Sequence, residues 1–223
     1  MNIQPIIDLL GVLIWPLVLL FVLYYFGGPL KRFLSNVSEI TFNFAGVQAT
    51  AKRQQIEAAT LLGAAYQQNA PSDGPTIEEN AQEIADSVGK AGTPQAARRL
   101  SDARVLWVDD MPENNIYERR ALQALGLRFT LSTSTEDALK KTQLSQYDVI
   151  ISDMGRSSDP RAGYTLLDAL RKGGNCTPFI IYSGSNAPQH KAEAKQHGAF
   201  GSTSRPDELF DLTISAILAY EQS

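Results

Sequence analysis

Cysteine and net charge are both scarce in this sequence of 223 residues, and no internal repeat is visible in it. Cys176 is the single cysteine, so no disulfide can form within the chain, which fits a reducing compartment. The formal net charge is only −4, from 20 basic and 24 acidic side chains that are mixed along both halves of the chain. Proteins that bind nucleic acid usually carry a basic surface, so we expect no nucleic-acid partner. Hydrophobic residues make up 43% of the chain, which excludes disorder throughout.

One long uncharged run stands near the N-terminus, from Leu9 to Phe26. As a helix, this run would span roughly 27 Å, close to the hydrocarbon thickness of a bilayer. A cleaved signal peptide is disfavoured because the first basic residue, Lys31, follows the run, and a buried core helix is disfavoured because the run is too long. We therefore expect a transmembrane anchor over residues 1–30. Because Lys31 and Arg32 follow it, the positive-inside rule predicts a single-pass protein of the inner (cytoplasmic) membrane, with its C-terminal domain in the cytoplasm.

Residues 31–103 form the predicted connecting region between this anchor and a C-terminal domain. Alternating apolar residues over Ile40–Ala49 predict a short hairpin, and helical periodicity predicts a helix over Thr50–Gln68. A second helix is expected to begin at Thr76, where Glu79 completes a capping box. The apolar stripes expected on the two helices are Ile56, Ala59, Leu62, Ala65 and Tyr66, and then Ile77, Ala81, Ile84, Ala85 and Val88.

Helices this short cannot hold a core alone. They must pack on each other, on the domain that follows or on another copy of the chain. The sequence leaves two interpretations open, a simple spacer and a stalk for oligomerisation or partner binding.

From residue 104 onward, short apolar runs alternate with segments of helical periodicity. The expected strands are Val105–Val108, Arg128–Leu131, Val149–Ile151, Phe179–Tyr182 and Phe200–Ser202. The expected helices are Asn114–Leu125, Thr135–Leu144, Gly163–Arg171, Pro188–His197 and Pro206–Tyr220. This order predicts an α/β domain over residues 104–223, with a five-stranded, parallel, doubly wound sheet of the flavodoxin-like kind. In such a domain, ligands bind at the carboxyl ends of the strands.

Polar residues follow the expected strands at those ends. Asp109 and Asp110 follow the first strand, Asp153 the third, Ser183 the fourth and Arg205 the fifth. Carboxylates from neighbouring strand ends would lie within a few ångströms of one another, which is costly unless a cation is bound. Mg²⁺ prefers carboxylate oxygens together with water and phosphate oxygens, so the sequence predicts a magnesium site here.

Four segments in this order resemble the response-regulator receiver (CheY-like) domain: LWVDDMPENN, IISDMG, IIYSGS and GAFGSTSRPDEL. The resemblance extends over residues 104–221. It implies that Asp109 and Asp110 bind Mg²⁺ together with Asp153, and that Asp153 accepts a phosphoryl group. It also implies that the hydroxyl of Ser183 contacts that phosphoryl group, while Arg205 stands where a cationic clamp is expected.

The sequence departs from the family pattern at several points. Arg205 stands where the family has lysine, and Ser202 stands where it usually has an aromatic residue. The loop after Asp153 is longer than usual and adds Arg156 and Arg161. These arginines either approach a phosphoryl group or are solvated, and we expect them to be solvated. These departures favour an alternative, a degenerate receiver that is not phosphorylated and acts as a membrane-tethered binding or oligomerisation module.

The uncharged N-terminal run and the resemblance together imply a membrane-anchored receiver protein of bacterial two-component signalling. In this interpretation, Mg²⁺-dependent phosphorylation of Asp153 modulates protein–protein contacts. The expected partners are a histidine kinase or another phosphodonor protein, the membrane and a second copy of the chain. We do not expect an enzyme, because MPENN stands after the first strand where a nucleotide-binding enzyme of this fold would have a glycine-rich phosphate loop.

Overall fold

The computed structural model describes residues 50, 52–68, 84–89, 91, 93–156 and 159–220. Contacts within the chain separate residues 1–50 from a second compact unit, residues 51–223, which contains the features below. The expected transmembrane anchor, the hairpin over Ile40–Ala49 and the capping box at Thr76 lie outside the described residues. Within the described ranges, no helix combines the length and the apolar character that crossing a bilayer requires.

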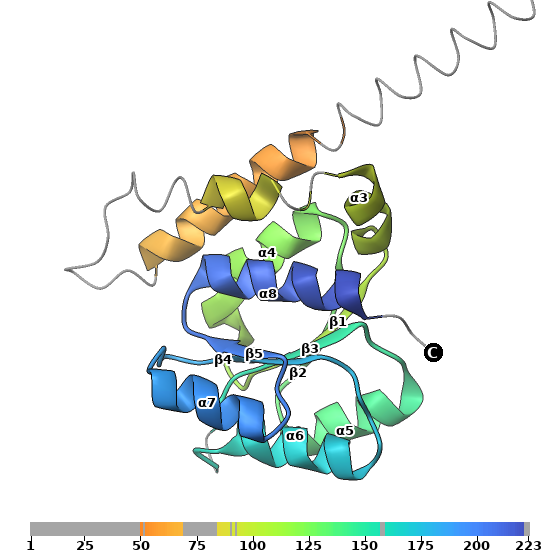
Figure 1. The fold of residues 1–223 in the computed structure, drawn as a ribbon, viewed down its shortest axis with the longest axis vertical. Helices are drawn as coiled ribbons and strands as arrows, with labels where there is room; N and C mark the ends of the chain where they lie inside the picture. The colour runs from red at the N-terminus through yellow and green to blue at the C-terminus, as the bar shows by residue number, and fades with distance from the viewer. Residues whose placement is uncertain are drawn as a thin grey trace, which may run out of the picture. The chain divides into compact units, whose positions relative to one another are not determined.

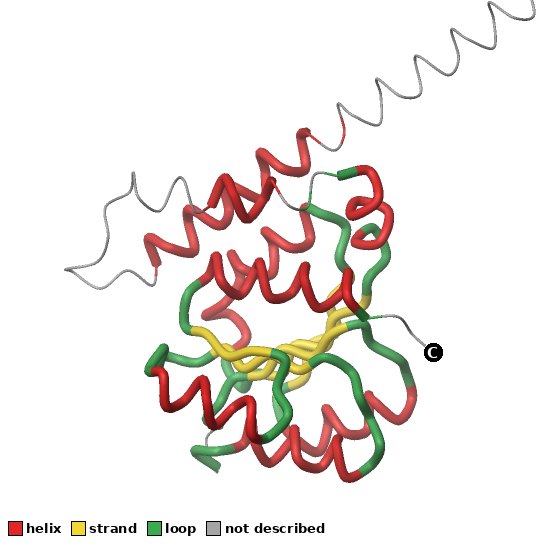
Figure 2. Tube along the Cα trace, in the orientation of Figure 1, coloured by secondary structure: helices red, strands yellow, loops and turns green. Residues whose placement is uncertain are grey.

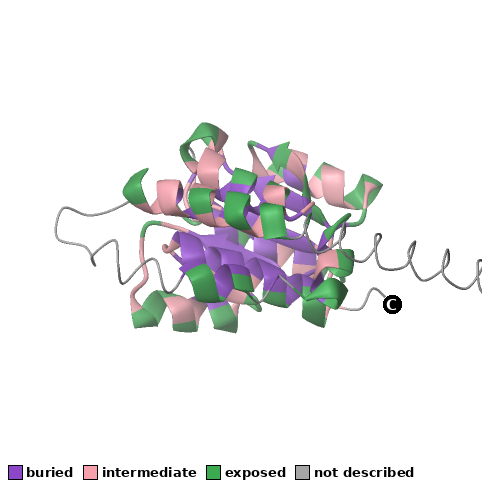
Figure 3. Ribbon diagram, turned by 90° about the horizontal axis from the view of Figure 1, so that it is seen from above, coloured by how far each residue is buried: buried purple, intermediate pink, exposed green. Residues whose placement is uncertain are grey.

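A five-stranded parallel sheet with the order β2-β1-β3-β4-β5 lies at the centre of this unit (Figures 1 and 2). Its strands are β1 (Arg104–Val108), β2 (Arg128–Ser132), β3 (Val149–Ser152), β4 (Phe179–Tyr182) and β5 (Gly201–Thr203). Every residue of β3 and β4 is buried, as expected for strands that helices cover on both faces. Figure 3 shows the buried sheet between exposed outer layers. The predicted five-stranded α/β fold is confirmed.

Helices cover both faces of the sheet (Figure 1). They are η1 (Pro112–Asn115), α4 (Ile116–Ala124), α5 (Thr135–Leu144), α6 (Ala162–Lys172), α7 (Pro188–Gln196) and α8 (Pro206–Ala219). Helices α4 and α8 share one hydrophobic core, and α5, α6 and α7 share the other. Local signals mark the starts of several of these helices, α5 and α8 among them. The Ser134 side chain accepts a hydrogen bond from the Asp137 amide at the start of α5, and Pro206 opens α8.

The helical residues 52–68 and 84–89 pack on the α4–α8 side of the sheet. Ala58, Leu62 and Val88 belong to the same core as Trp107 of β1 and other residues on that side. Of the three packing partners that the sequence left open, the structure therefore shows two. The segments pack on the α/β domain and on each other, and Gln55 Nε2 donates to the Val88 carbonyl oxygen at 3.4 Å. The two segments and the sheet share one core, so residues 52–68 are more than a spacer.

The buried stripes of these two segments differ partly from those expected. Leu62 and Ala65 are buried as predicted, but Ile56 is 61% exposed. The observed stripe starts at Ala58, and two residues of helix turn Ile56 by about 200° away from it. Ala85 was also predicted to be inward-facing and is exposed. Burial in the second segment falls instead on Ile84, Ser87 and Val88.

Helix α3 (Pro94–Leu100) has no counterpart among the predicted elements. The Thr93 hydroxyl accepts a hydrogen bond from the Ala96 amide at 3.1 Å, and proline opens the first turn. This cap followed by proline is the sequence signal that could have predicted the helix. Arg99 Nη2 donates to the carbonyl oxygens of Ile217 (3.0 Å) and Tyr220 (2.6 Å) and so joins α3 to the end of α8.

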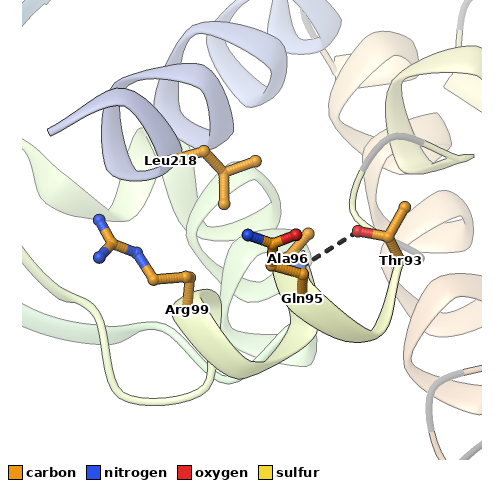
Figure 4. A pocket seen from close by; sticks show the side chains of 5 residues that line it. All are labelled: Thr93, Gln95, Ala96, Arg99 and Leu218. Carbon is orange, nitrogen blue, oxygen red and sulfur yellow. Dashed lines mark hydrogen bonds between the residues drawn. The ribbon is translucent and has the colours of Figure 1, made fainter.

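A shallow pocket of about 270 Å³ lies between α3 and α8 (Figure 4). Thr93, Gln95, Ala96, Arg99 and Leu218 line it. Arg99 is the single charged residue in this lining, and its guanidinium already donates to carbonyl oxygens of residues 217 and 220. The pocket therefore lies where α3 packs on α8, and none of its lining residues belongs to the polar strand ends.

Candidate functional site

The expected acidic cluster lies at the carboxyl ends of two adjacent strands. Val108 of β1 is the register partner of Ser152 of β3, so the residues that follow them leave the sheet side by side. The Asp153 amide donates to the Val108 carbonyl oxygen at 2.9 Å, which ties the end of β3 to β1. One carboxylate oxygen from each of Asp109, Asp110 and Asp153 lies within 4.8 Å of the others. The parallel topology thus brings together three carboxylates from two separate places in the sequence.

The carboxylate of Asp109 is buried and held from two sides. Its Oδ1 accepts a hydrogen bond from the Met111 amide at 2.8 Å, and its Oδ2 accepts one from Asn115 Nδ2 at 2.6 Å. Asn115 was missing from the residues expected at the site. Its place in η1, six residues after the aspartate, is what brings its amide within reach. These bonds fix the orientation of the carboxylate before any ligand arrives.

Asp153 is half-buried and carries a perturbed pKa. Burial raises the pKa of its carboxyl group, and the charges of Asp109 and Asp110 raise it further. The Met154 amide, which donates to Oδ1 at 2.7 Å, acts in the opposite direction and lowers the pKa. Burial is the largest of these causes, so the net effect is a raised pKa of Asp153.

Three clustered carboxylates suit a hard divalent cation. Such an ion takes carboxylate oxygens as ligands and would offset the mutual repulsion that raises the pKa of Asp153. Asp109, Asp110 and Asp153 each offer one oxygen at the spacing that a shared ion requires. The donor set therefore fits Mg²⁺.

Ser183 lies at the same edge of the sheet. Ile181 of β4 is the register partner of Ser152, so the residue two positions further along lies beyond the strand end beside the Asp153 loop. The Ser183 amide donates to the Thr203 carbonyl oxygen at 3.0 Å, which ties this turn to β5. The structure therefore brings Ser183 and the acidic cluster to one edge of the sheet.

The family model of the response regulator receiver domain matches residues 105–214. These residues form a receiver domain. Among solved structures, the receiver domain of Francisella response regulator 1452 is 25% identical over 53% of this chain and 99% of its own, with a TM-score of 0.48. Chemotaxis response regulator CheY4 of Vibrio cholerae is 28% identical over 52% of this chain and 98% of its own, with a TM-score of 0.45. TrrA of Thermotoga maritima, solved with Mg²⁺ and BeF, is 22% identical over 51% of this chain and 98% of its own, with a TM-score of 0.45. No curated protein matches the chain.

Arg205 follows β5 in the receiver domain, as predicted, and stands just before α8. Its Nε donates to Asp207 Oδ1 at 3.2 Å, and its Nη2 donates to Asp207 Oδ2 at 3.0 Å. Nη2 also donates to the Tyr66 hydroxyl oxygen at 3.1 Å. The hydrogen bond to Asp207 is the main reason why the pKa of Arg205 is raised. These contacts join the expected cationic clamp to α8 and to the helical residues 52–68.

We expect Tyr66→Phe to lower the free energy of unfolding by about 1 kcal/mol, because the hydroxyl that accepts from Arg205 is lost. Burial and a hydrogen bond to Asp207 raise the pKa of Tyr66, and the residue is half-buried. Urea unfolding followed by circular dichroism measures the change. Tyr117→Phe is the control, because Tyr117 also lies half-buried on a helix of the α4–α8 side. An equal decrease in the free energy of unfolding in the two variants would show that the hydrogen bond from Arg205 to the Tyr66 hydroxyl does not stabilise the fold.

Arg156 corrects an expectation, because it is buried rather than solvated. Only 9% of the residue is exposed. Its amide and carbonyl form an antiparallel bridge with Asp159, at 2.9 and 2.8 Å, and this bridge folds the loop after β3 back on itself. Arg161 does remain solvated as predicted, with 59% of its side chain exposed in an ion pair with Glu193. The two loop arginines therefore differ because the bridge turns one inward.

Proposed function

We propose that this receiver domain accepts a phosphoryl group on Asp153 and that Mg²⁺ held by Asp109, Asp110 and Asp153 supports the transfer. Phosphorylation then modulates contacts with other proteins. The observation that carries the proposal is the cluster itself, in which one oxygen from each carboxylate lies within 4.8 Å of the others at the edge of a receiver domain. Its location and partners are proposed from the sequence: a single-pass anchor in the inner membrane and a histidine kinase or another phosphodonor protein.

The reaction follows from the groups around Asp153. The Met154 amide holds Oδ1, which leaves Oδ2 as the nucleophile. Oδ2 attacks the phosphorus of the donor, a P–O bond forms, and the bond between phosphorus and the donor breaks with its electron pair leaving on the donor. In this proposal the Ser183 hydroxyl, which belongs to the same edge of the sheet, donates a hydrogen bond to a phosphoryl oxygen. A bound Mg²⁺ supplies positive charge that offsets the carboxylates and the phosphoryl oxygens.

A specific observation favours the alternative, in which the domain is a binding or oligomerisation module that is not phosphorylated. The guanidinium of Arg205 is engaged by Asp207 and Tyr66, so its charge is already partly compensated at the start of α8. If that engagement persists, the cationic clamp is missing. The experiment below separates the two functions.

The test is the intact mass of the full chain after incubation with Mg²⁺ and acetyl phosphate. We expect one added phosphoryl mass, absent without Mg²⁺ and absent in Asp153→Asn. Asp102→Asn, which changes an exposed aspartate outside the cluster, should be phosphorylated like the wild type. Phosphorylation that persists in Asp153→Asn, or a wild type that adds no mass while a known receiver reacts beside it, would refute the proposal.

The pH dependence provides a second readout. Because the pKa of Asp153 is raised, its carboxylate protonates at a higher pH than an ordinary aspartate, and phosphorylation should fall as the pH drops through that value. The folded protein binds this proton more tightly than the unfolded chain, so ionisation of Asp153 destabilises the fold as the pH rises through the same window. Asp153→Asn should therefore unfold at higher urea concentration than the wild type in metal-free neutral buffer. If Asp153→Asn is more stable than the wild type and is not phosphorylated, its loss of phosphorylation cannot be attributed to unfolding.

A further inference from the structure

The guanidinium of Arg156 is buried next to Asp153 of the acidic cluster. Its Nη2 donates to Ser152 Oγ at 2.6 Å and lies 3.4 Å from the carbonyl oxygen of Asp153. Its Nη1 donates to Thr135 Oγ1 at 3.1 Å, at the start of α5. Its Nε is buried and has no hydrogen-bond partner among the described residues. A charged side chain this deeply buried is costly unless nearby opposite charges compensate it.

The charges that compensate Arg156 come from the cluster. Burial lowers the pKa of Arg156, and Asp153 leads the negative charges that raise it, followed by Asp110 and Asp109. The effect is mutual, since Arg156 lowers the pKa of Asp153. Asp159, on the other side of the loop bridge, contributes least of these acidic residues. The guanidinium thus lies against the backbone of Asp153, 3.4 Å from its carbonyl oxygen, and its hydrogen bonds hold it to β3 and α5.

We propose that Arg156 is a resident counter-ion of the acidic cluster, which weakens the binding of a divalent cation there and stabilises the phosphoryl group on Asp153. The inference rests on the proposed function for its second half, and for its first on the buried position of the guanidinium beside Asp153. It assigns to the loop after β3 a positive charge close to the cluster, while the guanidinium of Arg205 is engaged by Asp207 and Tyr66.

The two effects have opposite signs, which distinguishes them from a role in packing. Removing the guanidinium leaves the three carboxylates more negative, so Mg²⁺ should bind more tightly. The same removal takes a positive charge away from the phosphoryl oxygens, so phosphorylation should become less favourable. A residue that merely holds the loop in place would, when replaced, disturb the cluster and weaken both.

The experiment compares Arg156→Met with Arg161→Met in the full chain. Arg161 lies in the same loop, but its side chain is 59% exposed and pairs with Glu193, so its replacement removes a charge outside the cluster. Isothermal titration calorimetry with Mg²⁺ alone gives the dissociation constant, and intact mass at saturating Mg²⁺ gives the rate of phosphorylation by acetyl phosphate. For Arg156→Met we expect the dissociation constant for Mg²⁺ to fall about tenfold and the phosphorylation rate to fall about tenfold. For Arg161→Met both should change less than about twofold.

Arg156→Lys separates the loss of the charge from a disturbed fold, because lysine retains the positive charge and loses only the planar guanidinium. It should bind Mg²⁺ about as the wild type does. Weaker or unchanged Mg²⁺ binding in Arg156→Met would refute the role of Arg156 as a counter-ion of the cluster. If the wild type is not phosphorylated while Mg²⁺ binding still tightens in Arg156→Met, the proposed function is refuted but the counter-ion role of Arg156 is supported. If the wild type is phosphorylated and Arg156→Met reacts equally fast, the phosphoryl half of the inference fails alone.

Discussion

Leu62→Ala is expected to lower the free energy of unfolding by about 3 kcal/mol. Leu62 is fully buried and belongs to the core that also contains Trp107 and Phe210, although it comes from a helical segment that precedes the receiver domain in sequence. Shortening the side chain removes apolar contacts and leaves a cavity, because the neighbouring side chains relax only in part. Urea unfolding of the full chain followed by circular dichroism measures the change.

Ile56→Ala is the matched control for this prediction. Ile56 lies on the same helical segment and is likewise a large aliphatic residue, but it is 61% exposed. Its replacement should change the free energy of unfolding by no more than about 0.5 kcal/mol. If the two variants were equally stable, residues 52–68 would not be part of the core and the spacer interpretation would return. A loss at Leu62 alone would mean that a chain cut at residue 104 loses part of its own core.

Gly163→Ala should both destabilise the protein and impair phosphorylation, although alanine is the better helix former. Gly163 is in the first turn of α6, and its amide donates to the Met154 carbonyl oxygen at 2.8 Å. A Cβ atom there would lie 2.9 Å from the carbonyl oxygen of Asp153 and 3.1 Å from the Met154 Cα. Both are backbone atoms of the loop that carries the proposed phosphoacceptor, so relief requires that loop to move. We expect a cost of about 2 kcal/mol.

Gly155→Ala tests whether the effect comes from this close approach. Gly155 is in the same loop, but a Cβ atom there would meet its nearest neighbour, the Pro160 carbonyl oxygen, at an ordinary 3.6 Å. Urea unfolding should place this variant within about 0.5 kcal/mol of the wild type. Phosphorylation by acetyl phosphate should fall at least about tenfold in Gly163→Ala, since misplacing the nucleophile by an ångström has a large effect on rate. A stable, fully reactive Gly163→Ala would show that the loop tolerates the shift.

The sequence by itself determined the elements of the α/β domain and the edge of the sheet where the acidic residues meet. The observed β4 and α5 have the predicted bounds, Phe179–Tyr182 and Thr135–Leu144. These elements follow from local signals: apolar runs that need burial on both faces, and capping residues at helix starts. Parallel strands end at a common edge, so Asp109 and Asp153 were predictable neighbours once the strands were known.

Only the tertiary structure decided which face each side chain presents and what long-range partner it meets. Arg156 is buried because a bridge to Asp159 turns the loop inward, whereas charge alone predicted a solvated side chain. Arg205 meets Tyr66, 139 residues away in the sequence, because residues 52–68 pack on the α4–α8 side. The inward face of that helix starts at Ala58 instead of Ile56, since the receiver core selects the stripe that packs best against it. Such choices depend on contacts between distant parts of the chain, and local periodicity carries no information about them.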